Sequence, residues 1–401
     1  METVEATPPA APTTPGDGPQ APAPHLSSAV TPPHPEDPSG VGPRPRRHRT
    51  VAPWVPARVL VTPAALEHAH GRAMVERAEA AGVREVVRLK ANRLTGLRGA
   101  DERETYRLAK QTLAVVVAPP SALRLQPIPP SADWRLDLAA GCPAHCQYCY
   151  LAGSLQGPPV TRAYANIDDV VAQVDPHTGR GTITSVDPLR ADEGTTFEAS
   201  CYTDPLGIEH LTGSLAVLVE QFAGRPDASL RFTTKFAHVD GLLALDHRRR
   251  TRVRMSVAPP AVEKFEGGTS SVDDRLVALG RLARAGYRVG LTVAPVMPVD
   301  DWPAQYARLL DDAGAALEGA DDLDLTVELI THRFTPGSRE VQLGWYPATK
   351  LDLDPANRSQ KRTKFGSVKY VYRKPVHDEL RAWFEREVAE RLPAARVLYW
   401  T

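Results

Sequence analysis

The feature that most constrains the fold is a regular alternation of short apolar segments and longer amphipathic segments across residues 131–335. Strands that alternate with helices predict a parallel sheet with right-handed crossover connections. The predicted strands are Trp134–Leu138, Thr195–Ala199, Ser229–Thr233, Arg252–Val257, Tyr287–Val293 and Leu323–Ile330. The helices predicted between them are Ile167–Val174, Ile208–Phe222, Val239–Leu245, Val272–Ala285 and Trp302–Leu317.

This repetition of strand and helix predicts an α/β fold, a partial (β/α)6 barrel rather than a complete barrel of eight units. A doubly wound open sheet is the alternative, and periodicity alone does not separate the two architectures. In both, functional groups collect just beyond the carboxyl ends of the strands. We therefore expect the functional residues in the loops that follow the predicted strands.

The rest of the chain divides into three segments. Residues 1–53 are rich in proline, with 13 of the 38 prolines in the first 50 positions and no Phe, Trp or Tyr there. Such a segment buries too little apolar surface to offset its ordering entropy, so we expect a disordered tail. Residues 54–130 predict a small α/β lead-in, and residues 336–401 predict a hairpin followed by a helix.

Charge and hydropathy exclude several classes of protein. The 48 basic residues are balanced by 48 acidic ones, which argues against a protein that coats nucleic acid by bulk charge but leaves local basic patches open. No run approaches 18 apolar residues, and no secretory signal pattern is present. We therefore expect a cytoplasmic protein that does not enter the membrane.

Three of the four cysteines, Cys142, Cys146 and Cys149, form a C-x3-C-x2-C pattern directly after the first predicted barrel strand. This spacing also suits one face of a helix, but Gly141 and Pro143 oppose a helix and favour a loop. Three thiolates in a loop can hold three irons of a 4Fe–4S cluster and leave the fourth iron open. A zinc site completed by His145 and a set of free buried thiols are the alternatives.

The cysteine pattern resembles that of the radical S-adenosylmethionine superfamily, and further segments resemble the spore photoproduct lyase family within it. The matching segments are Gly141–Tyr150, Phe197–Cys201, Gly207–Thr212, Arg231–Phe236, Gly267–Ser271, Glu328–Thr335 and Lys369–Arg373. The resemblance covers about residues 55–401. It implies a radical S-adenosylmethionine barrel over residues 131–335 and a DNA-contacting hairpin and helix over residues 336–401.

The resemblance also implies a reaction. Cys142, Cys146 and Cys149 would ligate a 4Fe–4S cluster, which binds S-adenosyl-L-methionine and splits it to methionine and a 5′-deoxyadenosyl radical. The radical takes a hydrogen from C6 of the dihydrothymine in 5-thyminyl-5,6-dihydrothymine, a UV lesion of DNA. The bridging carbon–carbon bond then breaks. Such a DNA repair lyase restores two thymines.

The fourth cysteine follows the second predicted strand. Taken alone, Cys201 is typical of a small buried apolar residue, but a weak S–H bond also makes a thiol a good hydrogen-atom donor. The resemblance implies that Cys201 donates hydrogen to the thymine radical and that Tyr148 and Tyr150 relay hydrogen back to the cofactor. For Tyr148, aromatic packing beside the cluster is an equal alternative.

Further positions follow from the resemblance. Thr203, Lys235 and Ser256 match positions that contact S-adenosylmethionine. The predicted contacts to UV-damaged DNA are Lys364, Phe365, Lys369 and Tyr372, within a basic run that a solvated hairpin would also explain. An electron donor such as a flavodoxin or ferredoxin is implied as a partner.

Two departures bear on the substrate. Lys364 and Phe365 stand where the family has arginine and tyrosine, and Tyr202 and Thr203 follow Cys201 in place of smaller residues. A diverged enzyme of the family with another substrate is therefore one alternative. A non-catalytic nucleic-acid-binding protein with a structural metal centre is another.

Overall fold

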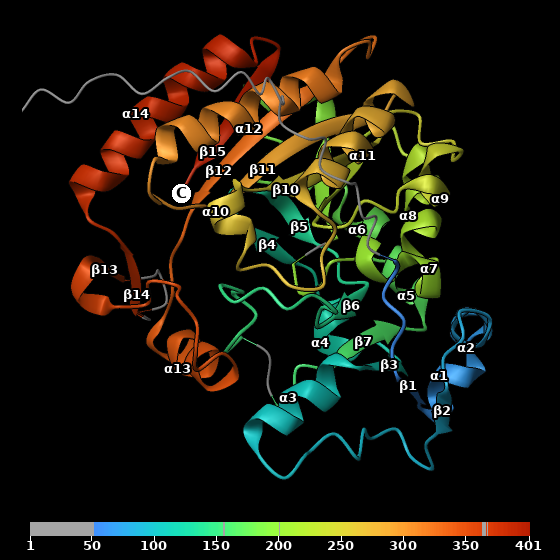
Figure 1. Ribbon diagram of the computed structural model, residues 1–401. Coiled ribbons are helices and arrows are strands. Elements are labelled where there is room, and N and C mark those ends of the chain that lie inside the picture. The colour runs from blue at the N-terminus through green and yellow to red at the C-terminus, as the bar shows by residue number, and fades with distance from the viewer. Residues whose placement is uncertain (1–51, 155–156, 200, 363–365, 367) are drawn as a thin grey trace, which may run out of the picture. The chain divides into compact units, whose positions relative to one another are not determined.

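A computed structural model describes residues 52–154, 157–199, 201–362, 366 and 368–401 (Figure 1). Most of the proline-rich tail and the predicted DNA contacts Lys364 and Phe365 lie outside the described residues. The described residues group into one compact unit.

The main sheet carries the strand–helix repeat. Its strands run in the order β15-β12-β11-β10-β9-β8-β5-β4. They are β4 (Gln126–Ile128), β5 (Ala132–Arg135), β8 (Thr195–Glu198), β9 (Ala228–Thr234), β10 (Thr251–Val257), β11 (Arg288–Val296), β12 (Leu325–Thr331) and β15 (Ala395–Trp400). From β5 to β12 the strands are parallel neighbours in chain order. A doubly wound sheet reverses its order, so the sheet is the predicted partial barrel.

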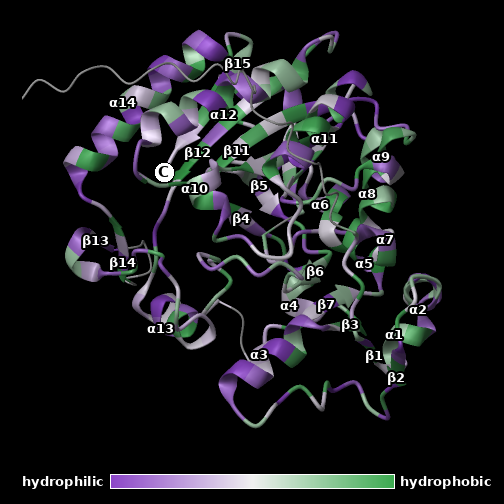
Figure 2. Ribbon diagram, in the orientation of Figure 1, coloured by the Kyte–Doolittle hydropathy of each residue, from purple (hydrophilic) through white to green (hydrophobic). Residues whose placement is uncertain are grey.

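Helices connect the parallel strands much as predicted. They are α5 (Ile167–Val171), α6 (Val174–His177), α7 (Glu209–Thr212), α8 (Ser214–Ala223), α9 (Asp240–Leu243), α10 (Pro260–Glu263), α11 (Val272–Arg284) and α12 (Trp302–Leu317). The single helix expected over Ile208–Phe222 is divided, because Gly213 adopts a left-handed conformation between α7 and α8. Hydrophobic and hydrophilic residues alternate along α12 and α14 (Lys374–Arg391), as in helices with one face on a core (Figure 2).

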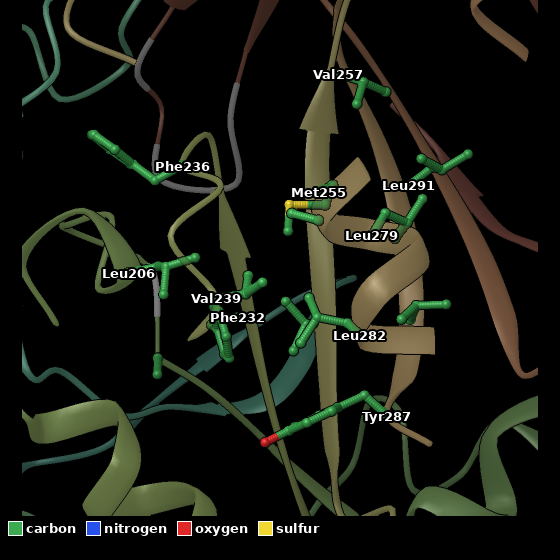
Figure 3. Packing of buried hydrophobic residues seen from close by; sticks show 14 of the residues in the cluster. Leu206, Phe232, Phe236, Val239, Met255, Val257, Leu279, Leu282, Tyr287 and Leu291 are labelled. Atoms are coloured by element: carbon green, nitrogen blue, oxygen red, sulfur yellow. The ribbon is translucent and has the colours of Figure 1, made fainter. Parts of the chain in front are cut away.

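The two faces of the parallel strands bury different kinds of side chain. Along β10, Val253, Met255 and Val257 belong to the main apolar core. Leu279 and Leu282 of α11 lie beside this strand and belong to the same core (Figure 3). Burial of each such side chain contributes about 1.5–3 kcal/mol. The helices are therefore held on the sheet by an ordinary apolar layer.

The alternate positions of the same strands carry buried polar and charged side chains. Arg254 of β10 forms ion pairs with Glu198 of β8 and Glu328 of β12, and Arg231 of β9 also pairs with Glu328. Each of these side chains is at most 3% exposed. Tyr399 of β15 donates a further hydrogen bond to Glu328 at 2.9 Å. Because removing one partner of a buried pair costs about 3–5 kcal/mol, this network ties the strands together.

The N-terminal segment forms the expected small α/β unit. Its sheet has the order β2-β1-β3-β7-β6. Its elements are β1 (Arg58–Val61), α1 (Pro63–Glu67), α2 (Ala69–Ala80), β2 (Glu85–Arg88), α3 (Glu102–Lys110), β3 (Thr112–Val116), α4 (Pro120–Leu123), β6 (Ala139–Ala140) and β7 (Thr161–Tyr164). The last two strands lie beyond residue 130, so this sheet draws on the segment that we assigned to the barrel.

The C-terminal region contains the predicted hairpin and helix. The hairpin pairs β13 (Arg358–Arg362) with β14 (Val368–Tyr372), after α13 (Pro336–Trp345) and before α14. A strand that was not predicted, β15, joins the main sheet parallel to β12. None of the helices in the described parts of the chain combines the length and the apolar run needed to cross a bilayer.

A buried histidine connects β12 to the hairpin and gives the fold a pH dependence. His332 is 2% exposed, and the Arg358 guanidinium donates to its Nδ1 at 3.4 Å. Burial and the neighbouring Arg358 lower the pKa of His332 to about 3. The unfolded chain therefore binds more protons between about pH 3 and 6.5, and stability in that window rises with pH.

We predict that His332 alone costs the chain about 2–3 kcal/mol of unfolding free energy when the pH falls from about 7.5 to 4.5. His332→Gln should remove this part of the loss, because glutamine does not titrate. Anaerobic urea unfolding at the two pH values measures it. Equal losses in the two proteins would contradict the assignment.

Candidate active site

The sequence-predicted site residues lie around one rim of the partial barrel. Cys201 follows β8, Lys235 follows β9, and Ser256 lies near the end of β10. Parallel strands in consecutive order place their carboxyl ends side by side, which brings these positions together. The cysteine loop reaches this rim by a different route from the predicted one. It follows β6, which pairs with β7 in the N-terminal sheet, so it bridges the two sheets.

The cysteine segment is a loop, as Gly141 and Pro143 predicted. Gly141 has φ +88°, and a Cβ there would lie 2.4 Å from the carbonyl oxygen of Val160, so only glycine fits. The Gly141 N–H donates to the carbonyl oxygen of Tyr202 at 2.7 Å. Further along, the His145 N–H donates to Gly267 O at 2.6 Å. The loop is thus fastened to two other loops of the rim.

The three loop cysteines are free thiols that act on one another electrostatically. Burial raises the pKa of Cys142 to about 12, against the lowering effect of Lys110. The Lys110 ammonium, 8% exposed, donates to the carbonyl oxygen of Cys142 at 2.6 Å. It places a buried positive charge beside the loop, where an anionic centre would be stabilised. This lysine was missed in the sequence, where nothing separates it from other helix lysines.

Within the described ranges, no group of three or more His, Cys, Asp or Glu side chains is arranged to hold a single metal ion. His145, the proposed fourth zinc ligand, instead has its Nδ1 3.1 Å from the hydroxyl of Tyr106. Cluster ligands each bind a different iron and need not converge on one point. A three-thiol donor set in one loop therefore fits a 4Fe–4S cluster better than a zinc ion.

Cys201 is a buried thiol next to this loop. Its side chain is 7% exposed, and its sulfur lies 3.9 Å from the carbonyl oxygen of Glu198. Burial raises the pKa of Cys201 well above its usual range, and the nearby Asp137 carboxylate adds to the rise. Cys201 therefore keeps its hydrogen at neutral pH, which suits a hydrogen-atom donor.

The two tyrosines of the cysteine loop point to different partners. The Tyr150 hydroxyl donates to the carbonyl oxygen of Cys201, while the residue as a whole is 60% exposed. The Tyr148 hydroxyl donates to Glu266. Of the two, Tyr150 has a direct contact with the residue that carries the candidate donor thiol.

Lys235 and Ser256 meet in a polar cluster that includes two residues missed by the sequence analysis. The Lys235 ammonium donates to Ser256 Oγ at 2.9 Å and to Glu266 Oε1 at 2.7 Å. The second Glu266 oxygen pairs with Arg275 of α11. Burial raises the pKa of Glu266, but Lys235 and Arg275 outweigh it and lower the pKa to about 2. Glu266 lies one position before the matched segment Gly267–Ser271, and this proximity could have identified it as a candidate site residue.

The loop after Cys201 supplies one more candidate ligand group. The Thr203 hydroxyl is buried and has no hydrogen-bond partner among the described residues. Its neighbour Asp204 accepts from the Lys235 N–H and from the Thr234 hydroxyl, both at 2.7 Å. An orphaned buried hydroxyl costs stability unless a ligand or water satisfies it. Thr203 is thus available to a bound group.

The predicted DNA contacts lie on the hairpin. Tyr372 is half-buried beneath the Arg358 guanidinium, 3.8 Å from the ring centre, so its ring packs within the fold. Lys369 lies opposite Lys361 in the antiparallel pair. Burial, Arg333 and Lys361 together lower the pKa of Lys369. Like charges directly opposite are destabilising.

The fold and the site define a partial-barrel α/β protein with a three-cysteine loop at the carboxyl rim of its sheet. A family model described as spore photoproduct lyase matches residues 54–401. The chain therefore belongs to the spore photoproduct lyase family.

Individual members of the family are similar to this chain over most of its length. Spore photoproduct lyase of Geobacillus sp. is 40% identical over 350 residues, 87% of this chain and 99% of the relative. That of Bacillus subtilis is 36% identical over the same shares. A solved spore photoproduct lyase variant with bound AdoMet and dinucleoside spore photoproduct has a TM-score of 0.80 and 39% identity, covering 87% of this chain and all of that one. A second, complexed with dinucleoside spore photoproduct, matches equally.

We predict that Glu266→Ala lowers the free energy of unfolding by about 3–5 kcal/mol, because it leaves Lys235 and the buried Arg275 without their shared carboxylate. Glu379→Ala, an exposed residue of α14, is the control and should change it by no more than about 0.5 kcal/mol. Anaerobic denaturant unfolding measures both. Equal effects would show that the Glu266 cluster adds nothing to stability.

Proposed function

We propose that this protein is a radical S-adenosylmethionine carbon–carbon lyase that converts 5-thyminyl-5,6-dihydrothymine in DNA to two thymines. The observation that carries the proposal is the meeting, at one rim, of a protonated buried thiol with the three-cysteine loop and the Lys235–Ser256 pair. Membership of the spore photoproduct lyase family supports the choice of lesion. The relatives with bound dinucleoside spore photoproduct support it further.

The residues fit the two cofactors that the family implies. Cys142, Cys146 and Cys149 would hold a 4Fe–4S cluster, with Lys110 offsetting its negative charge. Thr203, Lys235 and Ser256 would hold S-adenosylmethionine, since they offer a free hydroxyl, an ammonium and a second hydroxyl. When bound, these cofactors would supply a 5′-deoxyadenosyl radical, the species able to take hydrogen from C6 of the lesion.

Cys201 supplies the hydrogen that completes repair. After the bridging bond of the lesion breaks, one thymine carries an unpaired electron on its former methyl carbon. The S–H bond of Cys201 breaks, a C–H bond forms on that carbon, and the unpaired electron remains on sulfur. The raised pKa of Cys201 supports this role, because a thiolate has no hydrogen to give.

Tyr150 would restore the thiol. Its hydroxyl donates to the carbonyl oxygen of Cys201, the residue that carries the sulfur. Transfer of hydrogen from this hydroxyl re-forms the S–H bond and leaves a tyrosyl radical. Tyr148, hydrogen-bonded to Glu266 beside Lys235, lies next to the cofactor residues. It would give its hydroxyl hydrogen to the Tyr150 radical and would itself be restored by a hydrogen from 5′-deoxyadenosine.

DNA and an electron donor are the proposed partners. Arg333, Lys361 and Lys369 act on one another and would hold DNA phosphate at the hairpin. Lys364 and Phe365, which lie outside the described residues, remain predicted contacts. Tyr372, packed under Arg358, would support the hairpin. The electron would come from a reduced flavodoxin or ferredoxin.

The test is an anaerobic assay of reconstituted protein with reductant, S-adenosylmethionine and DNA carrying the lesion. Wild type should release two thymines per lesion. Cys201→Ala should still cleave S-adenosylmethionine, but its thymine radical has no thiol to quench it and should end in side products. Chromatography of digested DNA separates the outcomes. Absence of 5′-deoxyadenosine from the iron-loaded wild type, or clean repair by C201A, would refute the proposal.

DNA affinity should depend on salt through the hairpin cations. Loss of one phosphate contact lowers the slope of log affinity against log salt by about 0.9. We predict this change for Lys369→Ala, measured by fluorescence anisotropy on lesion-containing duplex. Arg308→Ala, whose side chain is 85% exposed on the outer helix α12, is the control and should keep the wild-type slope. An unchanged slope in K369A would remove Lys369 from the interface.

A further inference from the structure

The loop that carries Cys201 alternates free functional groups with anchored ones. Cys201 and Thr203 present a thiol and an unpartnered hydroxyl. Between and after them, Tyr202 and Asp204 have side chains bonded to neighbouring elements. Asp204 ties the loop to the end of β9. Tyr202 ties it to the end of β5, and this second anchor has no assigned role.

The Tyr202 anchor is built from two charged residues. The Arg135 guanidinium donates to the Tyr202 hydroxyl at 3.2 Å, and its centre lies 4.6 Å from the Tyr202 ring centre. Arg135 is itself paired with Asp137 at 2.9 Å. The two charged residues are two positions apart at the end of β5, a spacing that places side chains on one side of an extended chain. Tyr202 thus contacts the Arg135 guanidinium, which Asp137 holds in position. We call this Arg135–Asp137 pair the Arg135 fork.

The fork is costly, which argues against a role in stability alone. The Asp137 side chain is 4% exposed, and its Oδ1 atom is buried without a hydrogen-bond partner in the described structure. A half-satisfied buried carboxylate destabilises a fold. A cost of this kind is found at sites where geometry matters more than stability. The neighbour of Asp137 and Arg135 in this case is the Cys201 thiol, on which both charges act.

The backbone of the same loop is fixed from the other side. The Tyr202 carbonyl accepts the Gly141 N–H at 2.7 Å, and the Cys201 carbonyl accepts the Tyr150 hydroxyl. Both donors belong to the cysteine loop. The Arg135 fork and the cysteine loop therefore hold Cys201 between them, with Tyr202 in contact with both.

We propose that Tyr202, held by Arg135 and Asp137, is the positioning residue that aims the Cys201 thiol at the substrate radical and thereby decides whether that radical is quenched cleanly. The inference rests on the proposed function. Hydrogen transfer requires the reacting atoms to lie within about 3–3.5 Å, so a loosened thiol loses the radical to other reactions. Tyr202 does not touch the reacting atoms. Its effect appears in the products and not in cofactor cleavage.

The experiment compares product partition in the assay described above. Tyr202→Phe removes the hydroxyl that Arg135 holds but keeps the ring, and Arg135→Gln removes both the bond and the cation over the ring. Tyr399→Phe is the matched control, because it also removes one hydroxyl hydrogen bond, to Glu328 at 2.9 Å, within the barrel. For each protein, S-adenosylmethionine cleavage and the fractions of thymine and side products are measured.

We expect the side-product fraction to rise about threefold to tenfold in Y202F and further in R135Q, with cofactor cleavage at the wild-type rate. Y399F should keep the wild-type partition. Wild-type partition in both Y202F and R135Q would overturn the inference. Loss of cofactor cleavage in both would also overturn it, since the anchor would then serve the whole site. Failure of the wild type to repair the lesion would instead refute the proposed function.

Discussion

The structure depends on the parallel pairing of β5, β8, β9, β10, β11 and β12 in chain order. Pairing of this kind sends every carboxyl end to the same rim, so residues separated by more than a hundred positions meet there. Buried ion pairs among Glu198, Arg231, Arg254 and Glu328 connect β8, β9, β10 and β12 across the inner face. The site is built on strand ends that those contacts hold in register.

Two carboxylates organise the rim in different ways. Glu266 joins the Tyr148 hydroxyl, the Lys235 ammonium and the Arg275 guanidinium, and its low pKa keeps it charged. Asp137 faces a single cation and keeps one oxygen unpaired, and burial raises its pKa to about 6. The first arrangement is fully satisfied and rigid. The second leaves a buried carboxylate oxygen without a hydrogen bond beside the candidate donor thiol, which lowers the stability of the fold at that position.

Much of the site was predictable because its signals are local. The C-x3-C-x2-C spacing with Gly141 and Pro143 indicated a loop, and the loop is observed. Lys235 and Ser256 were placed by resemblance, and they lie 2.9 Å apart. Glu266, Arg275 and Lys110 were not predicted, because a buried charge is recognisable only once its partner across the fold is known. The division of α7 from α8 was missed because one glycine in a helical pattern is usually tolerated.

The sequence by itself determined the strand–helix repeat and the cysteine loop, because both follow from the spacing of residues along the chain. It also indicated the family, through the resemblance of several segments in the same order. The tertiary structure decided which groups are paired and which are free. It left the Thr203 hydroxyl without a partner, covered Tyr372 with Arg358, and set Tyr202 between the Arg135 fork and the cysteine loop. Burial and partner distance depend on elements far apart in sequence, and hydrogen bonds and pKa values follow from these two quantities.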